Sequence, residues 1–308
     1  MLRSNPETLK KRFFDMLGYW PDLENPKTIQ EKLLWRKLYE DMSEAVRLSD
    51  KVAVRDYVRD VVGERYLVDV LAIADDANDL DFDALPDSFV LKINRASSAN
   101  LVVDDKSRLD VAAIRRILNS MLRLEYGRRL GEHWYSAIPP KILAERLLVD
   151  ETTTIPVDYR FHTFHGKVFW LQVSTDKFLS DDAWGQFRSA GQKYVDTRRT
   201  VDANYGLDWQ PAPFHGRTHP PYKPLPKTPG PADEMIEVAE KLAGDWGYVR
   251  IDLYCLNDRD VYFSEMTFVH NSGLFPLFPE RYCEYLGSLW DIHRRYVRDE
   301  RPPMPLFT

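Results

Sequence analysis

Residues 247–273, GYVRIDLYCLNDRDVYFSEMTFVHNSG, decide the fold that we expect for this chain. Residues 249–256 and 261–267 are rich in β-branched and aromatic side chains, which favours strands. The four residues between them, 257–260 (NDRD), have the composition of a turn. The stretch is therefore predicted to form a β-hairpin with an acidic residue on each arm.

The two acids of this hairpin predict a metal site. If the turn closes with two or four loop residues, Asp252 lies opposite Glu265 and Arg250 opposite Thr267. Opposed residues have Cβ atoms about 5 Å apart, and like charges there destabilise the pair. Bound Mg²⁺ would offset the repulsion, since carboxylates from rigid strands, with nucleotide phosphates and water, commonly hold it. The alternative is an exposed hairpin, because a one-residue slip sends the acids to opposite faces.

Composition indicates a soluble globular protein. The chain has 308 residues, of which 44% are hydrophobic and 29% charged, so two or three packed subdomains are expected. The net charge of −6 offers no broad positive surface for nucleic acid or anionic membranes. The two cysteines, Cys255 and Cys283, fit a reducing cytoplasm better than a disulfide framework. No secretion signal or membrane span is visible.

Helical spacing of apolar residues predicts a helical lead-in over 6–20 and 27–48. Thr28 is a plausible N-cap for the second helix, with Glu31 three residues later. A further helix is expected from Ser49, whose hydroxyl and the following aspartate supply a cap.

Two lysines upstream of the hairpin are candidate anion-binding residues. Lys51 lies four residues before Arg55, on what would be an exposed helix face, so both could equally be solvated. Lys92 interrupts the apolar strand 88–94, where a buried unpaired charge is costly, and phosphate is its natural partner. The small polar segment 95–105 that follows could close over phosphates through N–H groups and serine hydroxyls, or be an ordinary hairpin loop.

Further candidates lie in the middle of the chain. Glu145 belongs to a short apolar stretch, 141–149, that is typical of a strand bordering a pocket. Arg160 lies in a predicted hairpin over 157–173, where a guanidinium suits a phosphate contact, although a surface sheet would look the same. Residues 175–228 show no clear periodicity. The remaining expected elements are a strand over 66–74 and helices over 111–130, 232–243 and 282–299.

These motifs, taken in order, resemble the ATP-grasp fold. SDK with VR, FVLK with a small-residue loop, ILAERLL, DYRF and RIDLY…YFSEMTF…SG are most similar to the TupA-like branch, named after a teichuronopeptide biosynthesis protein. The likeness runs from about Pro26 to Gly287. It implies an α+β fold in which two α+β subdomains grip ATP, after a helical N-terminal lead-in. The implied divisions are 1–48 (helical), 49–140 (N-terminal and phosphate-loop subdomain), 141–290 (C-terminal catalytic subdomain) and 291–308 (tail).

The resemblance also implies roles for matching residues. Lys51 and Lys92 would bind ATP phosphates, with Arg160 near the triphosphate. Glu145 matches the acid at the adenine and ribose end of the cleft. The loop with Ser97 and Ser98 would cover the phosphates through hydroxyl and backbone contacts.

That loop departs from the family pattern, because RASS stands here where the branch usually has a His-Gly-Ser-Gly-like sequence. The loop is therefore expected to differ from that of the family in flexibility and in backbone contacts.

At the hairpin, the resemblance makes Asp252 and Glu265 the Mg²⁺ ligands and places Arg250 near a reacting acyl phosphate. Many ATP-grasp enzymes have an asparagine two residues after the last acid. This chain has Thr267 there, with Asn271 as a possible substitute. Lys92, Arg160 and Arg250 would therefore be the catalytic cations.

The implied activity is an ATP-dependent carboxylate–amine ligase. A substrate carboxylate would attack the γ-phosphate, and an amine would then displace phosphate from the acyl phosphate. A carboxylated sugar or related metabolite and an amine are the expected substrates, in polysaccharide or envelope assembly near membrane-bound glycan enzymes. A sugar kinase on this fold and a degenerate ATP-binding scaffold are the alternatives. The candidate bases are His162, His215, His219 and His270.

Overall fold

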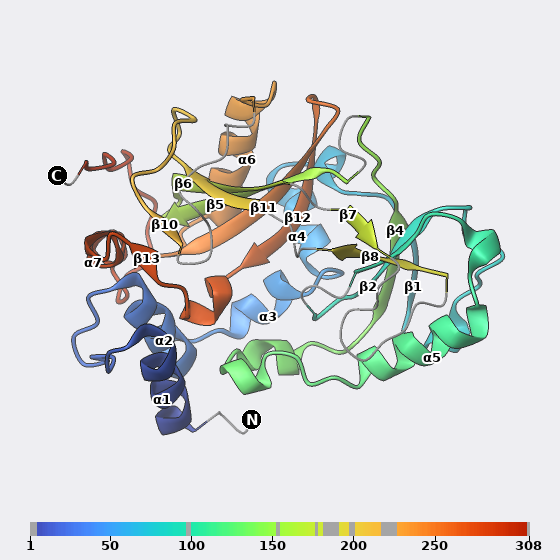
Figure 1. Cartoon of the computed structure of the whole chain (residues 1–308), viewed down its shortest axis with the longest axis horizontal. Helices are drawn as coiled ribbons and strands as arrows, with labels where there is room; N and C mark the ends of the chain where they lie inside the picture. The colour runs from blue at the N-terminus through green and yellow to red at the C-terminus, as the bar shows by residue number, and fades with distance from the viewer. Residues whose placement is uncertain are drawn as a thin grey trace.

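The computed structural model describes residues 5–96, 100–151, 155–175, 178–180, 191–196, 201–216 and 227–306. Two antiparallel sheets dominate it, with helices on their outer sides (Figure 1). One sheet has the strand order β1-β4-β2-β3-β8-β7 and the other β12-β11-β5-β6-β9. The architecture is α+β, as predicted.

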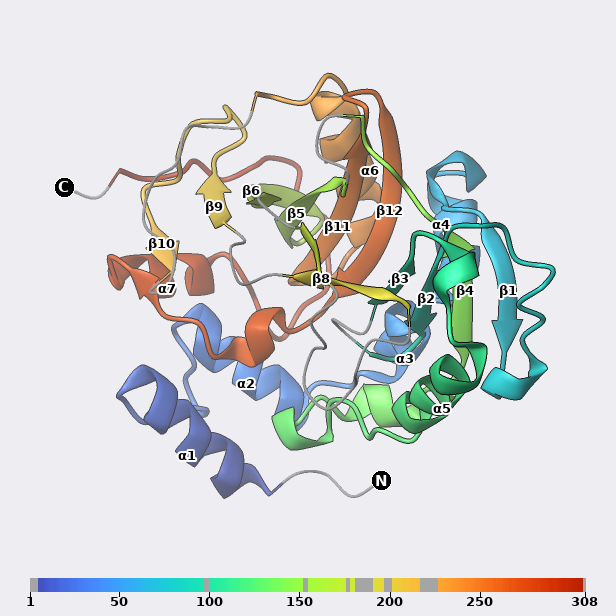
Figure 2. The ribbon, with the colours of Figure 1, turned by 45° about the vertical axis from the view of Figure 1, so that its right-hand side comes forward.

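The six-stranded sheet has one apolar face. Its strands are β1 (Val70–Ala74), β2 (Phe89–Ile93), β3 (Asn100–Val103), β4 (Ile142–Arg146), β7 (Phe178–Ser180) and β8 (Lys193–Asp196). Leu91 of β2 shares a core with Ile114 and Leu118 of α5 (Val111–Leu122). Side chains alternate along a strand, so Lys92 lies on the face opposite the one that α5 covers (Figure 2).

The five-stranded sheet has an apolar and a polar face. Its strands are β5 (Val157–Phe164), β6 (Lys167–Thr175), β9 (Val201–Tyr205), β11 (Val249–Leu256) and β12 (Asp260–Thr267). Ile251 and Phe161 pack in one core with Met235 and Leu242 of α6 (Ala232–Ala243). Side chains alternate along a strand, so the residues next to these apolar positions lie on the opposite face, and many of them are polar.

The chain passes between the two sheets more than once. β4 pairs with β1 and β2, so a division at residue 140 separates it from the sheet to which it belongs. β7 and β8 follow β5 and β6 of the five-stranded sheet in sequence, yet they extend the six-stranded sheet next to β3. Neither sheet is formed by one continuous segment.

The N-terminal helices are α1 (Pro6–Leu17), α2 (Ile29–Tyr39) and α3 (Ser43–Ser49). Thr28 and Glu31 form the predicted capping box at the start of α2. Arg36 of α2 is fully buried and donates to the carbonyl oxygens of Tyr248 and Phe268, at 2.7 and 2.9 Å. These residues flank β11 and β12, so α2 is tied to the ends of the predicted hairpin.

Several predicted boundaries were wrong. Ser49 ends α3, and the next helix, α4, begins only at Val54 (Val54–Val61). Asp50 is extended there because its carboxylate is occupied by Asn94 and by the N–H of Val52. Lys51 consequently lies in a turn.

The closing helix, α7 (Arg281–Ser288), is shorter than predicted because Gly287 lies directly against the backbone at the start of α2 and the chain then turns Trp290 into the core. α5 also ends earlier than predicted, and β1 begins later. No helix among the described residues is both long and apolar enough to cross a bilayer.

Candidate active site

The β11–β12 hairpin gives the predicted pairing. Asp252 lies opposite Glu265, and Arg250 opposite Thr267. All four side chains belong to the polar side of the five-stranded sheet, so the acids converge as the strand alternation requires.

The turn, however, has neither two nor four residues. Residues 257–259 form a three-residue loop, and Leu253 pairs with Phe263. That register alone would set Asp252 opposite Ser264. A shift between Asp252 and Leu253 inserts one extra residue in β12, a β-bulge, and this bulge brings the two acids face to face.

A row of polar side chains crosses all five strands at this level. The paired positions are Glu265, Asp252, Arg160, Gln172 and Asn204. The row begins with two carboxylates, continues with a guanidinium and ends with two amides. The row therefore has a charged end at β12 and an uncharged end at β9, while Asp202, two residues before Asn204 on β9, pairs with Arg160 at 3.3 Å.

Arg250 bridges the two acids. Its Nε and Nη2 donate to both carboxylate oxygens of Asp252, at 2.7 and 2.5 Å, and Nη2 lies 3.2 Å from Oε1 of Glu265. Nη1 lies 2.7 Å from Nδ1 of His270. Arg160 contributes a second guanidinium, with its Nε 4.0 Å from Asp252 Oδ2. The repulsion between the acids is thus offset by cations in this structure.

The surroundings shift the pKa values of the two acids in opposite directions. Burial raises the pKa of Asp252 to about 6, Glu265 adds to the rise, and Arg250 opposes it. Burial also favours the neutral form of Glu265, but the positive charges of Lys51, Arg250 and Arg160 outweigh this and hold its pKa below the ordinary value.

Lys51 joins the two sheets at this point. Its Nζ donates to the carbonyl oxygen of Ala96, at 2.6 Å, and lies 3.9 Å from Oε2 of Glu265. Its backbone N–H donates to Asn94 at the end of β2. Burial lowers the pKa of Lys51. The turn after α3 thus sets an ammonium group between the segment after β2 and the acid of β12.

Lys92 and Glu145 form a partly buried ion pair, with Nζ 2.5 Å from Oε2. Arg55 lies 3.3 Å from the other oxygen of Glu145 and donates to the carbonyl oxygen of Val68. Lys51 and Arg55 are therefore not solvated on an exposed face, which was the alternative reading of that pair.

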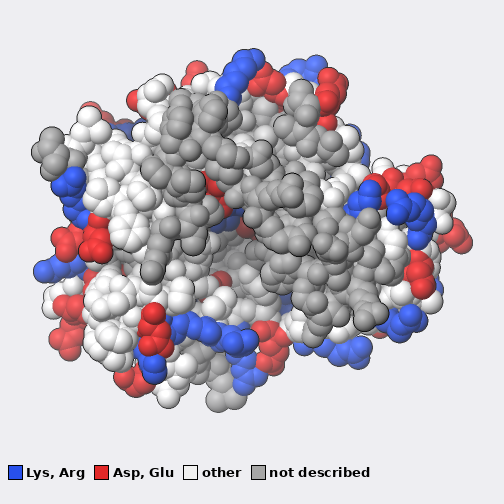
Figure 3. Space-filling view, in the orientation of Figure 1, with Lys and Arg blue, Asp and Glu red and all other residues white. Residues whose placement is uncertain are grey.

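A large cavity of about 560 Å³ lies beside this ion pair. Its polar wall includes Lys92 and Glu145, and its apolar wall includes Val90, Leu148 and Tyr254. Figure 3 shows a few acidic and basic atoms in a recess near the middle of this face of the molecule. The volume and mixed lining are typical of a small-molecule site.

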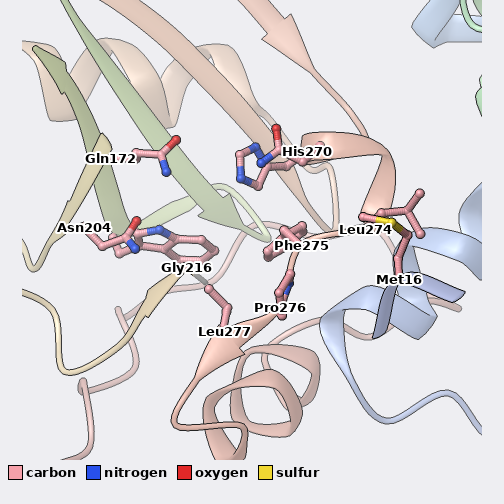
Figure 4. Close-up of a pocket in the computed structure, with 11 residues that line it drawn as sticks. Met16, Gln172, Asn204, Gly216, His270, Leu274, Phe275, Pro276 and Leu277 are labelled. Atoms are coloured by element: carbon pink, nitrogen blue, oxygen red, sulfur yellow. The ribbon is translucent and has the colours of Figure 1, made fainter. Parts of the chain in front are cut away.

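A small cavity of about 210 Å³ lies at the other end of the acid pair. It is lined by Met16, Trp170, Gln172, Asn204, Gly216, His270, Asn271, Leu274, Phe275, Pro276 and Leu277. These residues come from α1, β6, β9, β10 (His215–Gly216), β13 (Leu277–Phe278) and the segment between β12 and β13. Figure 4 shows Gln172 and His270 facing each other across it.

β11 connects the two cavities. Arg250, Asp252 and Tyr254 share one face of the strand, spaced about 7 Å apart. Tyr254 lines the large cavity, whereas Arg250 contacts His270 of the small cavity. The acid pair therefore lies between a nucleotide-sized space and a smaller one.

The family model for TupA-like ATPgrasp matches residues 31–184 and 187–291. The chain belongs to the TupA-like ATP-grasp family. Its fold is the ATP-grasp fold that the sequence predicted. No curated protein matches the chain.

Solved structures with a similar arrangement are ligases of this fold. D-alanine–D-alanine ligase from Bacillus anthracis is 15% identical, with a TM-score of 0.39, over 74% of this chain and 58% of that one. L-amino acid ligase from Bacillus licheniformis is 12% identical, with a TM-score of 0.45, over 87% and 56%. The ATP-grasp ligase PsnB with its minimal precursor is 12% identical, with a TM-score of 0.38, over 74% and 54%. The chain thus spans little more than half the length of each.

The donor set of this TupA-like chain fits Mg²⁺ bound together with a nucleotide. No three His, Cys, Asp or Glu side chains gather as a metal-binding cluster in the described part of the chain. Asp252 and Glu265 supply carboxylates, and the other ligands would be phosphate oxygens and water, as Mg²⁺ prefers. Thr267 donates to Glu265 at 3.2 Å, while Asn271 lines the small cavity. Their part in metal binding stays a prediction.

Two predicted residues lie outside the described part of the chain, and others that line the small cavity were not predicted from the sequence. Ser97 and Ser98 lie outside the described residues. Gln172 and Asn204 were not singled out, although Gln172 interrupts an apolar run, VFWLQV, which is a usable signal. Met16 reaches the small cavity from α1, and nothing in its helical pattern distinguishes it from a surface methionine.

Proposed function

We propose that this protein is an ATP-dependent carboxylate–amine ligase that forms an acyl phosphate. The observation that carries the proposal is the opposed pair of Asp252 and Glu265, with Arg250 across them, between two cavities in a chain of the ATP-grasp family. A site of this kind needs little covalent participation from the protein, because positioning and charge stabilisation dominate phosphoryl transfer.

ATP would occupy the large cavity. Its apolar wall suits a purine, and Lys92 with its partner Glu145 lies on its polar wall. The β- and γ-phosphates would then point along β11 toward Asp252, where Lys51 and Arg160 supply positive charge. Bound Mg²⁺, held by Asp252 and Glu265, would neutralise phosphate charge.

Arg250 would stabilise the reacting groups. It contacts both Asp252 and His270 of the small cavity, which supports a role for its guanidinium where the substrate carboxylate would meet the γ-phosphate. The carboxylate oxygen attacks phosphorus and ADP leaves. The amine, after losing a proton, attacks the acyl carbon and inorganic phosphate leaves.

The buried histidines are poor candidates for taking the amine's proton. Burial and the neighbouring positive charges hold the pKa values of His162 and His270 well below the ordinary range. His215 lies on β10, and His219 is outside the described residues.

The substrates proposed are a carboxylated sugar or related metabolite and an amino acid or other amine, in polysaccharide or envelope assembly. The motivation is membership of the TupA-like branch, which is named after a teichuronopeptide biosynthesis protein. The purified protein should release ADP in a screen of uronic acids against amino acids, and Asp252→Asn and Glu265→Gln should be inactive. Absence of Mg-ATP binding in calorimetry would contradict the proposal.

One observation favours a second candidate, a nucleotide-binding scaffold without activity. Arg250 already neutralises both acids, as a structural ion-pair network would. ADP release that requires any carboxylate acceptor would exclude the scaffold. Nucleotide binding without turnover for every acid and amine tested would favour it.

A further inference from the structure

The small cavity has an unusual lining for a site beside two arginines. Its polar groups are two asparagines, a glutamine and a histidine, and its remaining walls are aromatic, aliphatic or glycine. Among the described lining residues there is no aspartate, glutamate, lysine or arginine. The residues that face a ligand here are therefore uncharged amides and an imidazole.

The orientation of Gln172 is fixed by its neighbour. Nη1 of Arg160 lies 3.1 Å from Oε1 of Gln172. A guanidinium has only donors, so the carbonyl oxygen of the amide, and not its nitrogen, must face Arg160. The NH₂ group of Gln172 is then left for the cavity, where it offers hydrogen-bond donors.

The imidazole of His270 is fixed in the same way. Arg250 donates to its Nδ1 at 2.7 Å, so Nδ1 is the accepting nitrogen and the proton of the neutral ring is on Nε2. Figure 4 shows this ring directed into the cavity toward Gln172, with Asn204 below. Each arginine thus orients one neutral side chain, Arg160 that of Gln172 and Arg250 that of His270, so that an N–H group faces the cavity.

We infer that the small cavity binds an oxygen-rich, uncharged part of the carboxylate substrate, and that it selects a hydroxy acid over an α-amino acid. Hydroxyl, ether and carbonyl oxygens accept from the donors of Gln172 and His270. An ammonium group there would meet the donors of Gln172 and His270. The nearby carboxylates are already paired with guanidinium groups, Asp158 and Asp202 with Arg160 and Asp252 and Glu265 with Arg250. The ammonium group would be desolvated without a carboxylate partner among the described lining residues, which is costly. This inference rests on the proposed function, since it concerns the acid that is activated.

The cavity also limits the size of that group. Its volume of about 210 Å³ is below the roughly 300 Å³ at which drug-sized pockets begin. One monosaccharide-sized unit fits the space better than an extended chain does.

A matched pair of probes tests the selectivity. Gluconate and glucosaminate share a skeleton and differ in a hydroxyl or an ammonium group beside the carboxylate. Calorimetry of the full chain, with and without Mg-ADP, should give a gluconate affinity at least about tenfold higher, a difference of about 1.4 kcal/mol. Equal or stronger binding of glucosaminate, or binding of neither probe, overturns the inference.

The variant Gln172→Glu tests the cause. One carboxylate oxygen keeps the contact with Arg160, and the other replaces the NH₂ group, so the preference for gluconate should fall by about tenfold. Gln210→Glu makes the same change at an exposed position and should leave the ratio unaltered. An unchanged ratio in Gln172→Glu, with native folding by circular dichroism, also overturns the inference.

The readouts separate this inference from the proposed ligase activity. If the probes bind with the expected ratio but no acid supports ADP release, the ligase proposal fails and the cavity assignment stands. If ADP release occurs with α-amino acids in preference to hydroxy acids, the ligase proposal stands and the cavity assignment fails.

Discussion

The two ends of β11 are built in different ways. At the Tyr254 end, the large cavity has ion-paired charges, Lys92 with Glu145, on adjacent strands of one sheet. At the Arg250 end, the small cavity is lined by uncharged residues from five separate segments of the chain. The paired charges beside the large cavity thus come from neighbouring strands, whereas the polar groups of the small cavity come from β6, β9 and the segment after β12.

The largest expected effect lies between the two ends. Asp252→Asn removes one carboxylate and leaves its shape, so ADP release should fall by about a thousandfold, as when a transition-state charge contact is lost. Steady-state ADP release measures this, and thermal unfolding is the control for folding. Activity within a factor of about ten of the wild type would remove Asp252 from the proposed metal site.

At the large-cavity end, Lys92→Met should weaken ATP binding by up to about a hundredfold, because hydrogen bonds to charged groups contribute about 1.5–3 kcal/mol. Calorimetric titration with Mg-ATP measures the loss. Gluconate binding should be unaffected, and a parallel loss of both affinities would mean that the two cavities are not independent. Lys106→Met changes an equivalent charge outside both cavities and is the matched control.

Glu132, which lies behind the wall of the small cavity, is predicted to make the stability of the protein depend on pH. Burial raises the pKa of Glu132 to about 7, and Ser272, which follows Asn271 of the cavity wall, donates to its carboxylate. The folded state then holds this proton more tightly than the unfolded state does. The free energy of unfolding should therefore fall as pH rises from about 4.5 to about 7.

Glu132→Gln keeps an acceptor for Ser272 and removes the titration. Relative to the wild type, it should gain about 2–3 kcal/mol between pH 4.5 and pH 7.5, at about 1.4 kcal/mol per pKa unit. Urea denaturation at the two pH values measures the difference. A gain that does not depend on pH would show that packing, and not ionisation, is responsible.

The smallest effect is expected at the uncharged end of the polar row. Asn204→Leu removes a neutral amide of similar size, so the KM for the carboxylate substrate should rise by about tenfold with kcat little changed, the pattern of lost ground-state binding. The KM for ATP should stay the same. A fall in kcat at constant KM would instead place Asn204 among the groups that contact the transition state.

The same contrast explains what the sequence could predict. Asp252 and Glu265 were found because strand alternation and a turn signal fix a hairpin within 27 residues. The pairing was right although the turn was not, since the bulge at Ser264 compensates for a three-residue loop. The bridging position of Arg250 was not predicted, because alternation gives the face of a strand and not the direction of a long side chain.

The small cavity as a whole could not be predicted, although His270 and Asn271 of its wall were candidate residues. Met16 and Phe275 are more than two hundred residues apart in sequence, and their meeting depends on how α1 and the segment after β12 pack. Gln172 is the exception, because one amide inside an apolar strand indicates a polar neighbour. The ordered motifs therefore predicted the charged half of the site, and tertiary packing alone made the other half.

The strand order also has a mechanical consequence. The chain leaves the six-stranded sheet after β4, returns to it with β7 and β8, and leaves it again before β9. A force applied to the two termini would act on both sheets, because several segments of the chain run from one sheet to the other. A force spectrum should accordingly show one cooperative rupture, and the two sheets could not be produced as separately folding fragments by cutting the chain once.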